Sequence, residues 1–361
     1  MTAAVPLTAT LRVGGSRVSR VVVGVGRRVL LTVVNFAVFV VASFFLVLLI
    51  PGDPVVVATG GRLSGAELEA ARASYGLDGP WWQQFGTFLR QMATFDLGTS
   101  IATGRPVAQE LSIRVPATLE LVISGLVIAT VVAVLLSHYV VTHRSRAVSR
   151  VALAYARSAG AVPEYVLGIA FLFVFYAVLR WAPAPAGRLD PILIAPDRVT
   201  GFPVLDAILA GDGAAVGSYV AHLVLPVAVM VVAHTALLMK MLIPSLDQAI
   251  DDPATRFRVA SGAPRAMVLA SIYRRALPAM VATIGMLFGL FLGGAVVLEA
   301  LFGLGGLGQY AVDSVNSSDI FALRSFLIVT AGLCLLIYLL VDLVVMALDP
   351  RRASGAAAKD A

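Results

Sequence analysis

Long apolar runs separated by polar segments dominate the pattern of this 361-residue chain. An α-helix needs about 20 apolar residues to cross the hydrocarbon core of a bilayer. A membrane β-barrel would instead show short segments in which apolar and polar residues alternate. The pattern therefore predicts an all-α polytopic membrane protein with six transmembrane helices, over residues 29–50, 116–137, 158–179, 220–240, 276–298 and 325–348.

The polar segments divide the chain into a membrane region with loops and tails. The first interval between runs is long and mixed, and the interval after the third run is rich in Pro and Gly. The predicted organisation is a six-span region 29–348, with polar segments 51–115, 180–219 and 244–278, and with tails 1–28 and 349–361.

Arginine and lysine indicate the orientation, because cytoplasmic loops of membrane proteins carry an excess of both. With the N-terminus in the cytoplasm, 18 of the 27 Lys and Arg residues fall in cytoplasmic segments. We therefore expect both termini inside, 51–115 and 180–219 outside, and 244–278 inside. The first run is too long for the apolar part of a signal peptide and is followed by Ile50-Pro51-Gly52-Asp53-Pro54, so we interpret it as a retained span.

Composition supports this class. Apolar residues make up 59% of the chain and charged residues 13%, and these values exclude a soluble enzyme and a disordered chain. A single cysteine, Cys334, excludes a disulfide framework. The net charge of +6 arises from the loop arginines, so we expect no nucleic-acid partner.

Motifs for nucleotide, metal or catalytic chemistry are missing from the sequence. A P-loop needs Lys directly after Gly, whereas Lys240 follows Met239 and Lys359 follows Ala358. Residues 303–308 match G-x-G-x-x-G but join two predicted spans, so a tight turn is the simpler interpretation than a dinucleotide site. We therefore predict no catalytic residue, no metal site and no cofactor.

Five ionisable residues fall in or at the ends of the predicted spans, where an unpaired charge is costly. Glu120 and Glu164 lie near span ends, and Glu299 ends the fifth run as an interfacial anchor. For His234, a hydrogen-bonded interior group is a simpler interpretation than a ligand. Asp342 lies deeper, so we expect a partner on another helix or subunit, in either a structural contact or a moving interface.

The loop before the fifth run has its own signals. Asp251-Asp252-Pro253 is typical of a helix start, with acids at the N-terminus and Pro in the first turn. Ser261-Gly262-Ala263-Pro264 predicts a turn, and a second helix over 265–275 leads to Pro278 and the fifth span. Two short helices of this kind can lie on lipid as a basic amphipathic surface or dock into a partner.

An ordered set of motifs covers residues 28–351 and resembles the permease subunit of dipeptide/oligopeptide ABC importers. The motifs are Ile50-Pro51-Gly52-Asp53-Pro54, Tyr75-Gly76-Leu77-Asp78-Gly79-Pro80-Trp81-Trp82-Gln83-Gln84-Phe85, Asp96-Leu97-Gly98-Thr99-Ser100, Arg114-Val115-Pro116-Ala117-Thr118-Leu119-Glu120-Leu121, Ala221-His222-Leu223-Val224-Leu225-Pro226, Glu299-Ala300-Leu301-Phe302 with Gly305-Gly306-Leu307-Gly308, and Leu340-Val341-Asp342-Leu343 with Asp349-Pro350-Arg351.

The resemblance implies a type I ABC importer permease in the cytoplasmic membrane of a bacterium. In this family two permeases, usually of two related types, form the pore. Two ATPase subunits sit beneath it, and an extracytoplasmic binding protein delivers the substrate. Relatives carry dipeptides, longer peptides, or nickel and other chelates. The chain itself would be a non-enzymatic half of the pore, in contact with membrane lipid.

The resemblance also implies a coupling loop at about 252–278, where the family carries an Ala-x-Ala-x-Gly-type motif that docks on the ATPase. Gly262 is the best match for the central glycine, although residues 257–260 depart from the small residues and Lys of the pattern. The candidate coupling residues are Asp252, Arg256, Arg258, Ala260, Gly262, Arg265, Arg274 and Pro278.

A proton-coupled secondary transporter that uses Asp342, Glu164 and His234 is the alternative. The sequence shows no inverted repeat and few acids at the membrane centre, which speaks against it. An intramembrane hydrolase would need a nucleophile–base pair that the sequence does not offer.

Overall fold

A computed structural model describes residues 15–49, 52–158 and 160–348 of the chain. This part is helical and contains no β-strand. The helices are α1 (Gly15–Leu48), α2 (Pro54–Ala58), α3 (Ala66–Ser74), α4 (Trp81–Ala93), α5 (Val107–Thr142), α6 (Ala147–Arg157), α7 (Glu164–Phe171) with the π-helical η1 (Leu172–Val178), α8 (Pro203–Leu209), α9 (Gly213–Asp251), α10 (Pro253–Ala260), α11 (Arg265–Phe302), α12 (Leu307–Asn316) and α13 (Ile320–Leu348).

Five described helices are long and apolar enough to cross a membrane, namely α1, α5, α9, α11 and α13. The helices α5, α9, α11 and α13 contain the predicted second, fourth, fifth and sixth runs and extend beyond them, and α1 covers the predicted first run, 29–50, up to Leu48. Ile50, the last residue of that predicted run, lies outside the described residues. The helix α9 has 39 residues and α11 has 38, each with proline inside. Both helices extend past their apolar runs, because residues of the adjoining polar segments continue the helix beyond the expected boundaries.

The predicted third span, 158–179, is not one membrane-length helix. The apolar helix there runs only over Glu164–Val178, or about 22 Å at the α-helical rise. The preceding helix α6 also lies beside α9, where the Tyr155 hydroxyl donates to the Val232 carbonyl at 2.5 Å. Gly160, with φ of +78°, and Pro163 at the start of α7 separate the two helices, since neither residue suits a helix interior.

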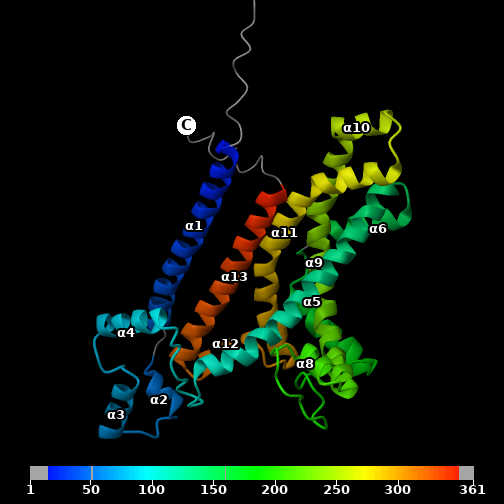
Figure 1. The fold of residues 1–361 in the computed structure, drawn as a ribbon. Helices are drawn as coiled ribbons and strands as arrows, with labels where there is room; N and C mark the ends of the chain where they lie inside the picture. The colour runs from blue at the N-terminus through cyan, green and yellow to red at the C-terminus, as the bar shows by residue number, and fades with distance from the viewer. Residues whose placement is uncertain (1–14, 50–51, 159, 349–361) are drawn as a thin grey trace, which may run out of the picture.

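The short helices gather at the two ends of the long ones (Figure 1). One end, here the α10 end, carries α6, α10 and the start of α11. The other, the α4 end, carries α2, α3, α4, α8 and α12. The helices α5, α9 and α13 run from the α4 end towards the α10 end, whereas α1 and α11 run the opposite way, and α1 lies beside α13 on one flank.

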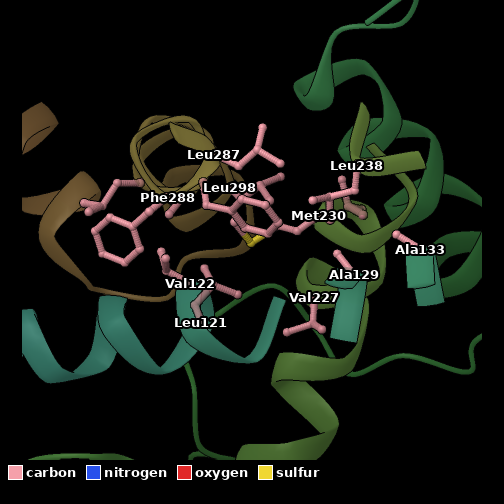
Figure 2. Close-up of a cluster of buried hydrophobic side chains, with 14 of the residues drawn as sticks. Leu121, Val122, Ala129, Ala133, Val227, Met230, Leu238, Leu287, Phe288 and Leu298 are labelled. Atoms are coloured by element: carbon pink, nitrogen blue, oxygen red, sulfur yellow. The ribbon is translucent and has the colours of Figure 1, made fainter. Parts of the chain in front are cut away.

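The main core lies where α5, α9 and α11 pack together, and Figure 2 shows its side chains. Ala129 and Ala133 on α5 are fully buried and face larger residues of α9. A Cβ on Gly125 would lie 3.2 Å from the Met230 Sδ. Small residues of this kind let helix backbones approach closely, which is how helices associate in lipid.

Gly285 of α11 makes a similar close contact with α13, and this contact gives a prediction. A Cβ there would lie 2.6–2.9 Å from three side-chain atoms of Val341, whereas a Cβ on Gly293 of the same helix would meet no atom within 4 Å. Overpacking costs about 1–3 kcal/mol, and Gly to Ala in a helix gains about 1 kcal/mol. We therefore expect Gly285→Ala to lower the melting temperature of the purified protein and Gly293→Ala to leave it equal or higher. Equal melting temperatures for the two variants would contradict the tight α11–α13 contact.

Candidate functional site

The helix α10 and the turn after it form a small hairpin at the α10 end. The Asp252 carboxylate caps α10 by accepting a hydrogen bond from the Ala254 amide at 2.8 Å. That amide, together with the Arg275 guanidinium, lowers the pKa of Asp252 below its usual range. The predicted helix start at Asp252-Pro253 is therefore confirmed.

Gly262 lies in the turn between α10 and α11. Its φ is +75°, a conformation that suits glycine and strains most other residues. A Cβ built at this position meets no atom within 4 Å. The turn thus needs glycine for its backbone angle, while the space around it is open.

Apolar and basic side chains are exposed together on the tip of this hairpin. Phe257 is 73% exposed, Val259 61% and Met267 54%. Thr255 is the one buried residue of α10, and its hydroxyl donates to the Ala249 carbonyl at 2.7 Å. Four of the predicted coupling residues are also exposed on this tip, namely Arg256, Ala260, Gly262 and Arg265, and Arg258 is half-buried. Aromatic residues, Met and Arg are the residue types enriched at protein interfaces.

Arg275 holds the hairpin on α11, and the candidate residues did not include it. Its guanidinium forms an ion pair with Asp252, whereas the predicted neighbour Arg274 is exposed. Arg274, Arg275 and Arg258 instead line a groove with a volume of about 620 Å³. Pro278 also lines it, inside the continuous α11 and not at a helix boundary. Neighbouring residues of a helix point about 100° apart, so only one arginine of the Arg274–Arg275 pair can face α10. Placing both residues on a helical wheel of α11 could therefore have identified Arg275.

Near the α4 end, the structure brings Glu120 of α5 and Glu299 of α11 to one arginine. Arg188, in the segment between η1 and α8, lies 3.5 Å from the Glu299 Oε1 and 3.9 Å from the Glu120 Oε2. Its Nε donates to the Leu304 carbonyl at 2.6 Å. All three side chains are largely buried, and that of Glu299 is fully buried. Sequence reasoning identified both acids but not Arg188.

Glu299 also explains the glycine-rich turn after α11. Its carboxylate accepts hydrogen bonds from the Thr118 hydroxyl and from the Gly308 amide, both at 2.6 Å, and so caps α12. Gly303 adopts the left-handed conformation that ends α11. A Cβ on Gly306 would collide with the Glu299 carboxylate. The turn interpretation of this segment is therefore confirmed, while Glu299 is an internal cap and not an interfacial anchor.

Glu164 and His234 meet where the third helical segment is broken. The His234 Nε2 lies 4.0 Å from the Glu164 Oε2, and its Nδ1 is 2.9 Å from the Met230 carbonyl oxygen. The imidazole stacks on Phe291, with ring centroids 4.0 Å apart. His234 is thus a hydrogen-bonded interior group, as expected, with a carboxylate nearby.

Asp342 has the partner on another helix that we expected. The Arg28 Nη1 of α1 lies 3.7 Å from the Asp342 Oδ2 and donates to the Asp342 carbonyl at 2.6 Å. Arg28 therefore belongs to the α1–α13 contact, because α1 begins at Gly15 and not after residue 28. The Asp342 side chain is 58% exposed in the single chain.

Comparison with known proteins agrees with this helical architecture. A family model described as "Binding-protein-dependent transport system inner membrane component" matches residues 125–354, and the model of its N-terminal part matches residues 21–122. The chain is 34% identical to the probable D,D-dipeptide transport system permease protein DdpB of Escherichia coli, over 87% of this chain and 93% of that protein.

The matches to two further relatives extend over nearly the whole length of those proteins. The dipeptide transport system permease protein DppB of Alkalihalophilus pseudofirmus is 28% identical, over 90% of this chain and 97% of that protein. The di/tripeptide transport system permease protein DppB of Pseudomonas aeruginosa is 28% identical, over 91% and 97%. These matches do not favour a secondary transporter. The chain belongs to the family of binding-protein-dependent transport system inner membrane components, the permeases of ABC importers.

Proposed function

We propose that this permease forms half of a pore that imports small peptides, with energy supplied through the α10 hairpin by ATPase subunits. The observation that carries this proposal is the exposed apolar and basic tip of the hairpin, around Phe257 and Met267. A chain whose sequence has no P-loop must receive its energy by contact. The tip is joined directly to α9 and α11, which form the core with α5.

The proposed assembly contains a second permease, two ATP-binding-cassette subunits and an extracytoplasmic binding protein. Small peptides are the proposed cargo, because the named relatives are permeases for D,D-dipeptides, dipeptides and di/tripeptides. The arginine-rich α10 end then faces the cytoplasm with both chain termini, and the α4 end receives the binding protein. In this arrangement α6, α7 and η1 together make a sixth, broken crossing.

Transport energetics distinguish this proposal from the proton-coupled alternative. In cells that depend on this permease for dipeptide uptake, removing the partner ATPase subunits should abolish uptake. A protonophore should leave uptake intact as long as cellular ATP is maintained. The opposite pair of results would support proton coupling and would overturn the importer proposal.

The orientation gives a second prediction, from exposed serines at opposite ends of the structure. Ser64 lies before α3 at the α4 end, and Ser261 follows α10. After Cys334 is replaced by Ser, a Ser64→Cys variant should react with an impermeant thiol reagent added to whole bacteria with a permeabilised outer layer. A Ser261→Cys variant should react only after the cytoplasmic membrane is disrupted. The reverse labelling pattern would invert the topology.

A further inference from the structure

A polar pocket at the α4 end lies outside the hairpin and the Arg188 cluster. It opens between the end of α1, the helices α2 and α3, and the start of α13, and its volume is about 410 Å³. Ligand pockets for small molecules begin at about 300 Å³. Five charged side chains line this pocket, namely Asp53, Glu69, Arg72, Asp78 and Arg324.

Arg324 is the unusual member of this set, because it is buried without an ionic partner. It is only 6% exposed, and its guanidinium lies over the rings of Phe44 and Phe88, at 4.5 and 5.7 Å. Among the described residues no carboxylate lies within 4.0 Å of it, and its buried Nε has no hydrogen-bond acceptor. The two ring contacts hold the side chain in place but leave its hydrogen-bonding capacity free.

The nearest acid in the sequence does not serve Arg324. The two carboxylate oxygens of Asp319 accept hydrogen bonds from the Ser100 hydroxyl and from the Ala322 amide, the latter at 3.1 Å. A buried charge without a partner is costly, and buried polar groups in proteins are generally satisfied. The pocket into which Arg324 faces is therefore built to receive an acceptor.

Of the other charged side chains of the pocket, three form ion pairs with one another and one, Asp78, forms none with a described residue. Arg72 pairs with both Asp53 and Glu69. Burial raises the pKa of Asp53, but Arg72 and the amides of Val55 and Val56 outweigh it and keep that pKa below its usual range. Asp78 is exposed and forms no ion pair with any described residue. One positive group, Arg324, and one negative group, Asp78, thus remain available on the same pocket.

We propose that this pocket binds a free small peptide as a zwitterion, with the carboxylate at Arg324 and the ammonium at Asp78. A guanidinium presents its donors as a fork that matches a carboxylate. A zwitterion engages both free charges, whereas a simple anion would engage Arg324 alone. This inference rests on the proposed function in taking peptides as cargo, and it makes the pocket a loading site at the entrance.

Direct binding tests the pocket without ATPase, nucleotide or binding protein. The full-length permease in lipid nanodiscs is titrated with L-alanyl-L-alanine, its C-terminal amide and its N-acetyl derivative, with saturation-transfer NMR as the readout. We expect saturable binding of the free dipeptide and at least tenfold weaker binding of each derivative. Arg324→Gln should remove the preference for the free acid over the amide. Asp78→Asn should remove the preference for the free amine over the acetylated peptide.

Arg90→Gln is the matched control, since Arg90 is exposed on α4 and does not line the pocket. It should keep both preferences. If Arg324→Gln fails to fold, the exposed Asp78 still tests the assignment. Absence of saturable binding, equal binding of acid and amide, or a preference that survives Arg324→Gln would overturn the pocket proposal while leaving ATP-driven import untouched. Dipeptide binding in a protein that transports no peptide would instead overturn only the proposed function.

Discussion

Arg188→Met is expected to destabilise the permease by about 3–5 kcal/mol, the usual cost when one partner of a buried ion pair is removed. The substitution leaves Glu299 fully buried and Glu120 largely buried, with no cation beside them. It also removes the donor to the Leu304 carbonyl in the turn before α12. Size-exclusion chromatography of a fluorescent fusion should show little monodisperse protein.

A second substitution separates charge from packing. In Arg188→Met/Glu299→Gln the amide oxygen can still accept from the Gly308 amide, with the NH2 group placed beside the Thr118 hydroxyl oxygen, while one uncompensated charge is gone. We expect the double variant to be more stable than Arg188→Met alone, because replacing a whole buried pair is often nearly neutral. Arg198→Met, at an exposed arginine of the same segment, should behave as wild type. A stable Arg188→Met protein would show that the cluster contributes little.

The long helices could be predicted because an apolar run of about 20 residues has few alternatives in a bilayer. Their ends could not, because helices continue into polar segments wherever tertiary contacts support them. Pro278 illustrates the point: it looked like a boundary, yet α11 passes through it to Arg265. Proline lacks an amide donor and crowds the preceding turn, but neighbouring helices can compensate within a packed bundle.

The broken third segment shows a different limit. Residues 158–179 contain enough apolar residues for a span. A count of apolar residues does not show where the backbone leaves the helical conformation. Gly160 and Pro163 interrupt the helix beside α9, and Glu164 then meets His234 at the break. Discontinuous helices of this kind commonly place polar groups inside transporters. The Gly-Ala-Val-Pro sequence was the available signal.

Partners distant in the chain were also beyond sequence reasoning. Glu299 and Arg188 are 111 residues apart, and Arg188 lies in an irregular segment without periodicity. Arg324 directly precedes the predicted run 325–348 and therefore reads as a residue outside the membrane, although it is buried with its guanidinium over the rings of Phe44 and Phe88. A pattern along one chain can identify an ionisable residue in an apolar setting, but only the packing of helices shows which group faces it.

Gly262→Asp is expected to leave insertion and folding nearly intact and to abolish transport. The open space around the built Cβ means that the new side chain would point into solvent in the isolated chain, and in the proposed assembly it would point towards the ATPase. Aspartate tolerates the left-handed conformation of this position better than most residues, so the intramolecular cost is small. At a protein contact, however, a buried unpaired charge costs about 3–5 kcal/mol, which corresponds to a loss of about 100-fold or more in affinity.

Gly262→Asn is the control that separates charge from shape, because asparagine has nearly the same volume and the same tolerance for positive φ. We expect the aspartate variant to lose both peptide uptake and transport-coupled ATP hydrolysis in the reconstituted importer, and the asparagine variant to retain more of both. The difference between them measures the electrostatic part of the contact next to Arg258 and Arg265. An assembled Gly262→Asp importer with wild-type coupled ATPase activity would show that the hairpin tip does not dock, and would return it to the interpretation of a basic helix on the lipid surface.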